Sequence, residues 1–181
     1  DRLKGWEINY QQAFTFLPGL LKNTGIQLNA THIQSELTYI LDPGTDTTPA
    51  TLGKAPWLGA SPNAVNLTLY YEDKRINTRV SLAQRDGYYT TYPLVAGACA
   101  PGVIGGVACD TPLINDFGGS KDTLNVDFSF SYKLSDRASF SIEGLNMTNQ
   151  ATSRYYYADN PVAALYGSPG RQFTIGFRFR N

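Results

Sequence analysis

The stretch that decides the fold is residues 124–147, LNVDFSFSYKLSDRASFSIEGLNM. In its first half, large apolar side chains occupy every second position, and small or polar side chains lie between them. The apolar set is Leu124, Val126, Phe128, Phe130 and Tyr132; the polar set is Asn125, Asp127, Ser129, Ser131 and Lys133. A period of two is typical of a β-strand with two different faces. A second alternating run follows residues 135–137, so the stretch predicts a hairpin.

The same period recurs along the rest of the chain. The five further alternating segments are residues 4–16, 26–39, 65–72, 76–89 and 172–179. With the two halves of the hairpin they predict seven strands and an all-β fold. The connections are expected to alternate between short turns and long loops, because Pro-rich or Gly-rich stretches separate every second pair of segments.

Alternating loop lengths are typical of an outer-membrane β-barrel, which has short turns at one end and long loops at the other. The polar positions favour the same fold, because they carry mostly Asn, Gln, Ser and Thr and only scattered charge. A water-filled lumen tolerates that mixture, and lipid requires the apolar side chains opposite. Aromatic residues near the segment ends are expected to form interfacial belts: Trp6, Tyr10, Phe14, Tyr70, Tyr71 and Tyr132.

The composition excludes some other classes. The chain has 181 residues, 15 Lys plus Arg, 15 Asp plus Glu and a formal net charge of zero. A nucleic-acid-binding domain is usually basic, so no nucleic-acid partner is expected. The sequence has no nucleophile motif, phosphate loop or dinucleotide pattern, so we expect no enzyme and no cofactor. The loop aspartates are expected to be solvated, and no metal site is predicted.

Four segments, in order, resemble parts of one family. They are KGWEINYQQ with FLPG (residues 4–12 and 16–19), VNLTLYYE (65–72), EGLNMTNQ (143–150) and GRQFTIGFRF (170–179). All four resemble strands and turns late in the barrel of TonB-dependent outer-membrane receptors. That family usually ends on an aromatic residue, whereas here Arg180 and Asn181 follow Phe179.

The resemblance implies that residues 1–181 are the C-terminal portion of a 22-stranded barrel and contribute its last seven strands, with long extracellular loops and short periplasmic turns. The plug domain and the TonB box would lie outside this chain. The family takes up scarce, bulky nutrients such as siderophores or oligosaccharides across the outer membrane of Gram-negative bacteria. The implied partners are outer-membrane lipid, the TonB complex through the missing N-terminal part, the ligand, and the barrel-assembly machinery through the last strand.

Ligand contacts are expected on the long loops, where aromatic rings can stack on sugars or flat chelates and arginines can meet anions. The candidates are Trp57, Arg85, Tyr88, Tyr89, Arg154, Tyr155, Tyr156 and Tyr157. The alternative for each ring is packing between loops. Cys99 and Cys109 lie in a Gly-rich loop and are expected to form a disulfide in an oxidising compartment, with two free thiols as the alternative.

Two other readings of the same strands stay open. In a soluble, secreted, carbohydrate-binding β-sandwich the apolar positions would form a core between two sheets about 10 Å apart. A smaller porin-type barrel would need an even number of strands and a closed ring within this chain.

Overall fold

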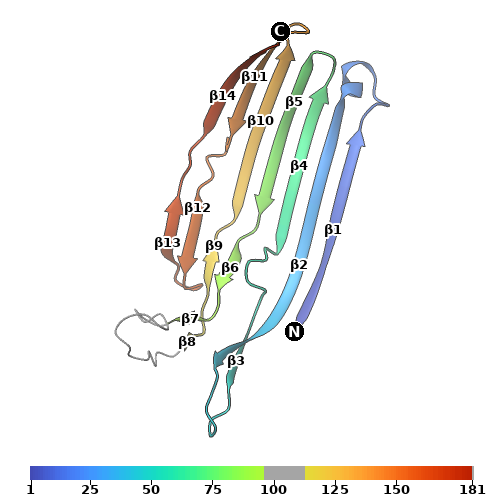
Figure 1. Cartoon of the computed structure of the whole chain (residues 1–181). Coiled ribbons are helices and arrows are strands. Elements are labelled where there is room, and N and C mark those ends of the chain that lie inside the picture. The colour runs from blue at the N-terminus through green and yellow to red at the C-terminus, as the bar shows by residue number, and fades with distance from the viewer. Residues whose placement is uncertain (96–112, 181) are drawn as a thin grey trace.

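The computed structural model describes residues 1–95 and 113–180. The fold is all β, and every pair of neighbouring strands is antiparallel (Figure 1). A short 3-10 helix, η1 (Gly19–Asn23), follows the first strand. No helix in the described part of the chain is long and apolar enough to cross a bilayer. The strands are β1 (Arg2–Ala13), β2 (Thr24–Asp42), β3 (Thr51–Ala55), β4 (Asn63–Glu72), β5 (Ile76–Arg85), β6 (Tyr88–Thr91), β7 (Leu94–Val95), β8 (Leu113–Ile114), β9 (Gly118–Ser120), β10 (Thr123–Lys133), β11 (Ala138–Leu145), β12 (Thr152–Tyr156), β13 (Val162–Gly167) and β14 (Gln172–Phe179).

The main sheet has the strand order β1-β2-β4-β5-β10-β11-β14. Each of the seven predicted segments contains one of these seven strands, and the all-β prediction is confirmed. The described residues hold fourteen strands in all, so the predicted number of seven applies to this path alone. β3 is an eighth strand that pairs with β2 beside this path. It does not close a ring, since among the described strands β1 pairs only with β2 and β14 only with β11.

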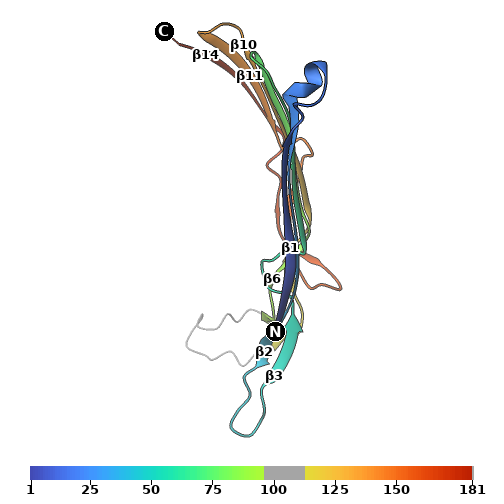
Figure 2. The same cartoon turned by 90° about the vertical axis from the view of Figure 1, so that its right-hand side faces the viewer.

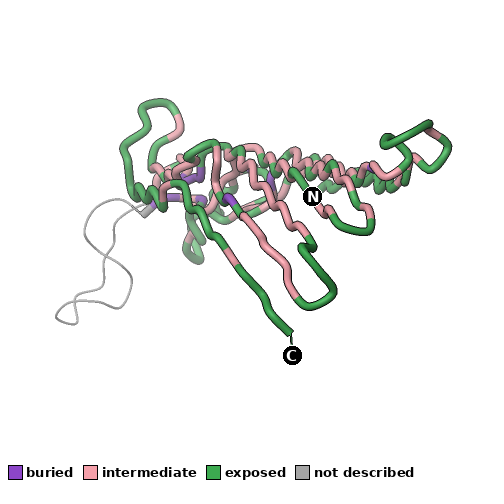
Figure 3. The backbone as a smooth tube through the Cα atoms, turned by 90° about the horizontal axis from the view of Figure 1, so that it is seen from above, coloured by how far each residue is buried: buried purple, intermediate pink, exposed green. Residues whose placement is uncertain are grey.

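Figure 2 shows the main sheet edge-on as a single curved layer. A sandwich would require a second sheet packed over one face, and the described residues place none there. The backbone of the main sheet is almost entirely intermediate or exposed in Figure 3. The buried hydrophobic residues of the described chain are Ala55, Tyr92 and Leu94, and all three lie outside the seven strands of the main sheet.

The register sorts the side chains into two continuous faces, because residues paired across strands point to the same side of a sheet. One row joins Leu28, Leu67, Leu82 and Val126 across four neighbouring strands. The apolar face comprises Ile8, Tyr10, Ile26, Leu28, Val65, Leu67, Leu69, Ile76, Val80, Leu82, Val126, Phe128, Phe130, Tyr132, Phe140, Ile142, Phe173, Ile175, Phe177 and Phe179.

The opposite side, the polar face, comprises Glu7, Asn9, Gln11, Gln27, Asn29, Asn66, Thr68, Arg79, Ser81, Asn125, Asp127, Ser129, Ser131, Ser141, Glu143, Thr174 and Arg178. Its side chains bond to one another: Asn29 Nδ2 donates to Glu7 Oε1 (2.9 Å) and to Asn9 Oδ1 (2.6 Å). Two hollows, of about 520 and 370 Å³, are lined mainly by this face. The polar face is therefore hydrogen-bonded and recessed.

The two ends of the main sheet differ. The turn end carries residues 14–23, 73–75 and 134–137, and the loop end carries residues 43–62, 86–95, 113–122 and 146–171 (Figure 1). The predicted alternation of short and long connections is thus confirmed. The long connections are not simple loops, however, because they contain β3, β6 to β9, β12 and β13. The segment predicted over 76–89 is also divided, since β5 ends at Arg85 and β6 begins at Tyr88.

Two buried glycines in the main sheet lie beneath aromatic rings. A Cβ on Gly25 would lie 2.2 Å from the Tyr70 hydroxyl, and a Cβ on Gly144 would lie 2.2 Å from Phe128 Cε1. Tyr70 pairs with Gly25 and Arg79, which places it on the polar face. The expectation that Tyr70 joins an aromatic belt on the apolar face is therefore wrong.

Residues 143–150, one of the family-like segments, complete the loop-side end of β10. Asn146 has a positive φ of 55°, and its side-chain Nδ2 donates to the carbonyl oxygens of Gln150 (3.1 Å) and Gly170 (3.0 Å). The Thr148 hydroxyl donates to the Leu124 carbonyl (2.6 Å), and Gln150 Oε1 accepts from the Leu124 amide (2.9 Å). These bonds pair backbone groups of β10 beyond the end of β11.

Gly144→Ala tests the packing of Phe128 over the sheet. The added Cβ would displace the Phe128 ring, and overpacking of this kind costs about 1–3 kcal/mol. We expect a lower denaturant midpoint for Gly144→Ala. Gly167→Ala is the control, because nothing lies within 4 Å of a Cβ at that position. Equal midpoints for the two variants would contradict the prediction.

The Asp73 carboxylate closes the β4–β5 turn. It accepts hydrogen bonds from the Tyr71 hydroxyl and from the amides of Ile76 and Arg75, each of 2.7 Å. These bonds, that from Tyr71 foremost, hold the pKa of Asp73 below its ordinary value. A lowered folded-state pKa stabilises the fold above the unfolded-state value of about 3.9, and this contribution is lost as pH falls through the folded-state pKa.

We therefore expect Asp73→Asn to lower the free energy of unfolding at pH 7. The difference in free energy of unfolding between this variant and the parent should shrink as pH falls below about 4, where the parent carboxylate also becomes neutral. Denaturant unfolding across this pH range measures both effects. A difference that stays constant with pH would show that the carboxylate charge is not involved.

Candidate functional site

The loop end is where the long connections meet. The Gly59 amide donates to the Tyr89 carbonyl (2.7 Å), which ties the first long connection to β6. A four-stranded sheet with the order β13-β12-β9-β6 then joins the second and third connections. All three connections are thus linked through β6, and this part of the chain holds the buried residues Ala55, Tyr92 and Leu94.

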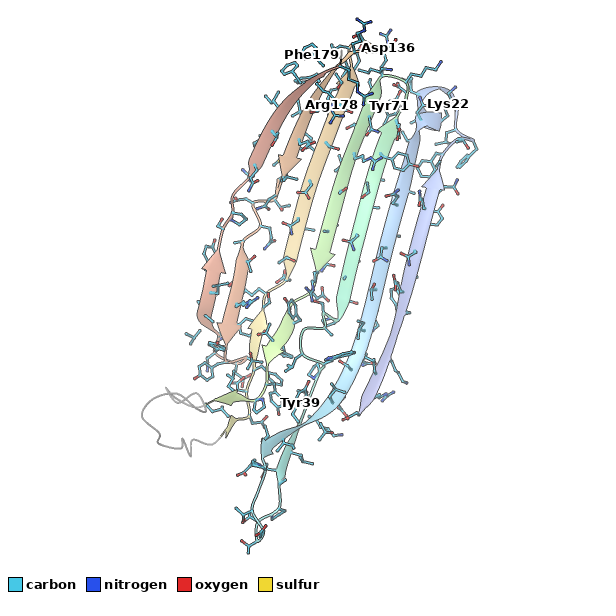
Figure 4. The ribbon with its side chains drawn as sticks, in the orientation of Figure 1. Lys22, Tyr39, Tyr71, Asp136, Arg178 and Phe179 are labelled. Carbon is cyan, nitrogen blue, oxygen red and sulfur yellow. The ribbon has the colours of Figure 1, made fainter. Side chains whose placement is uncertain are left out.

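Four rings form an aromatic stack at this end, defined as Tyr39, Tyr89, Tyr92 and Phe117. Phe117 is stacked between Tyr89 and Tyr92, with centroid distances of 4.1 and 4.4 Å. Tyr39, labelled at the loop end in Figure 4, meets Tyr92 edge-on at 5.3 Å. The Tyr92 hydroxyl donates to Asn115 Oδ1 (2.6 Å). The rings therefore pack segments far apart in sequence against one another.

Tyr89 and Tyr155 lie on one face of the small sheet, because both pair with Gly119 between them. Gly119 leaves room for the Tyr155 ring, whose hydroxyl would lie 2.6 Å from a Cβ at that position. Burial raises the pKa of the Tyr155 phenol, and the nearby Tyr89 and Asp116 raise it further. Tyr155 therefore stays protonated and able to donate a hydrogen bond at neutral pH.

Tyr88 and Arg154 lie on the other face, since both pair with Ser120. The Arg85 guanidinium lies over the Tyr88 ring, 4.0 Å from its centroid. Arg85 also donates from Nε to the Ser61 hydroxyl and from Nη2 to the Gly59 carbonyl (2.8 Å). Arg85 is therefore held by the first long connection and by an aromatic face.

The remaining residues predicted to contact a ligand are Tyr156, Tyr157 and Trp57. Tyr156 covers Gly118 on the face opposite Tyr155, because it is the next residue along β12. Tyr157 has a positive φ of 67°, and its amide donates to the Phe117 carbonyl (2.9 Å). The amide of Trp57 donates to the Ser35 hydroxyl (2.9 Å) and its side chain is half exposed. The structure thus gathers the candidates at one end but divides them between two faces.

Phe117 and Asp116 belong to this site and were not predicted from the sequence. Asp116 Oδ1 accepts from the amides of Phe117 (2.7 Å) and Ala158 (2.9 Å), and so joins the chain before β9 to the chain after β12. The surrounding Asn-Asp-Phe-Gly-Gly sequence indicates a turn, and one aromatic residue in a turn carries no periodic signal.

In the described residues no group of three or more His, Cys, Asp or Glu side chains could hold a metal ion. Cys99 and Cys109 lie outside the described residues, so their predicted disulfide stays a prediction.

Comparison of the chain with protein-family models, curated proteins and solved structures gave no match. The chain is thus defined by its geometry as an antiparallel all-β protein with an open, two-faced main sheet.

Phe117→Ala should remove the ring that packs between Tyr89 and Tyr92 and so loosen the aromatic stack. Each aromatic pair is worth about 0.5–1.5 kcal/mol beyond the area it buries, and Phe117 makes two. We expect a weaker near-ultraviolet circular dichroism signal and faster proteolysis at the loop end. Tyr166→Ala is the control, since that side chain is 71% exposed. The same changes in both variants would contradict a packing role specific to Phe117.

Proposed function

We propose that this chain is the C-terminal part of the barrel wall of a TonB-dependent outer-membrane receptor, which imports a scarce, bulky nutrient such as an oligosaccharide or a siderophore. The observation that carries the proposal is the apolar face, which extends across seven strands without a covering layer in the described residues. Phe173, Ile175 and Phe177 are each 66% exposed on it.

Water is a poor solvent for such a face. Contiguous exposed apolar patches larger than a few hundred Å² are uncommon on soluble monomers and mark sites of association with proteins or membranes. A lipid bilayer, by contrast, requires an apolar outer surface and tolerates a polar lumen, and the two faces of the main sheet match those requirements. The family-like segments near residues 4–19, 65–72, 143–150 and 170–179 narrow the proposal from barrels in general to this receptor family.

The unpaired edges of the main sheet favour a barrel with more strands than the seven of this path. Unpaired backbone groups are costly in lipid, so strands cross membranes only in closed barrels. β1 and β14 lie at the two edges of the main sheet, and each would need a further strand. In the proposed receptor these strands come from the preceding part of the barrel.

The loop end would face the cell exterior and contribute to ligand capture. Tyr89 and Tyr155 share a face there. The Arg85 guanidinium lies over the Tyr88 ring, and Arg154 lies on the same face of the small sheet as Tyr88. The proposed ligand contacts remain the eight residues predicted from the sequence. The turn end would lie in the periplasm, and the plug and the TonB complex would act from outside this chain.

Arginine substitutions on the two faces of β4 test the proposal. Leu69 lies on the apolar face and Asn66 on the polar face, and both side chains are exposed. An arginine facing lipid near the bilayer midplane costs about 2–4 kcal/mol, whereas lumen positions tolerate polar residues. We expect Leu69→Arg, made in the receptor polypeptide that carries this chain, to reduce the amount recovered in the outer-membrane fraction. Asn66→Arg is the matched control.

Equal recovery of the Leu69 and Asn66 variants would count against a lipid-facing apolar face. A stable, monodisperse protein in detergent-free buffer would count against it as well. Retained solubility would instead favour the secreted carbohydrate-binding sandwich, in which another layer covers the same face.

A further inference from the structure

Positive charge gathers at the turn end. The cationic residues there are Lys22, Lys74, Arg75, Lys133, Arg137, Arg178 and Arg180, and the acidic residues are Glu72, Asp73 and Asp136. Figure 4 shows Lys22, Asp136 and Arg178 at this end of the ribbon. The whole chain has a formal net charge of zero, so the excess of positive over negative side chains is a local feature of the turn end.

The three acidic groups are already engaged. Asp136 lies 2.9 Å from Lys133, and Glu72 lies 3.9 Å from Arg79. Asp73 accepts from the Tyr71 hydroxyl and from two turn amides. Within the described part of the chain, Lys74 and Arg75 make no salt bridge, and both residues are exposed at the β4–β5 turn.

A hollow of about 420 Å³ adjoins this turn, lined by Asp73, Lys74, Arg75, Ile76 and Tyr132. Ile76 and Tyr132 are paired across β5 and β10 and form the last apolar row before the turn. The next rows of the same face, Thr78 with Phe130 and Val80 with Phe128, continue away from it. The hollow thus has cations at its mouth and an apolar wall that leads onto the apolar face.

We infer that this hollow binds the headgroup of an anionic phospholipid. The phosphate lies against Lys74 and Arg75, and an acyl chain follows Ile76 and Tyr132 onto the apolar face. Basic pockets at the edge of a membrane protein bind anionic headgroups in this way. A free phosphate would use the cations but leave the apolar wall without a partner. The inference rests on the proposed function, because it requires the apolar face to lie in lipid.

The test uses the receptor polypeptide in detergent micelles that contain equal amounts of phosphatidylglycerol and phosphatidylethanolamine, with retained lipid counted by native mass spectrometry. The parent should retain phosphatidylglycerol preferentially. Since each cation near an anionic headgroup contributes about 1 kcal/mol, Lys74→Gln/Arg75→Gln should lower that preference roughly 30-fold. The matched control is Arg2→Gln/Lys4→Gln, which removes two cations from the loop end of β1 and should leave the preference unchanged.

Four results would overturn the inference. Equal lipid preference in the double variant and the parent would show that the two cations do not bind the headgroup. Bound inorganic phosphate that the double variant loses, together with no preference of the parent for phosphatidylglycerol, would assign the site to a free anion. Failure of the parent to enter micelles would overturn the proposed function as well, whereas a parent that enters them without preferring phosphatidylglycerol overturns only the lipid site.

Discussion

The structure depends on the register between neighbouring strands. From β1 to β14 the ladders of the main sheet run without a bulge, whereas the register shifts of the described residues occur beside Ile40, Tyr89 and Arg154, all at the loop end. A slip of one residue turns every side chain of a strand to the other face. Continuous pairing is therefore what converts a period of two in seven separate segments into one apolar and one polar face.

Burial differs between the main sheet and the loop end, and the difference follows from this register. In the main sheet the buried residues are Gly25 and Gly144, each beneath a ring from the neighbouring strand, so cross-strand packing replaces a protein core. At the loop end the strands bend and the chain packs against itself around Tyr92 and Phe117. The loop end, where we propose that ligand contacts lie, thus has an interior of its own, whereas the main sheet has only its two surfaces.

The sequence predicts the main sheet because each of its strands carries a local signal of several alternating residues. It does not predict β9 (Gly118–Ser120) or β12 (Thr152–Tyr156), which are short and, in β9, depend on glycines beneath Tyr155 and Tyr156. Pairing between β9 and β12 joins residues more than 30 positions apart, and no periodicity within either segment indicates its partner. For the same reason the sequence indicates that the aromatic residues gather at one end, but not that Tyr89 shares a face with Tyr155 across Gly119.

Two features of the main sheet need partners that the described residues do not supply. Among the described strands the apolar face has no covering layer, and the backbone edges of β1 and β14 have no second neighbour. A second packed sheet would cover the face and leave both edges open. A small closed barrel would remove the edges, but the seven-strand path of this chain does not close. Additional strands with the same alternation, closed into a larger barrel, would pair both edges, and lipid would cover the apolar face. The proposed membrane wall therefore accounts for the uncovered face and the unpaired edges together, which neither alternative does.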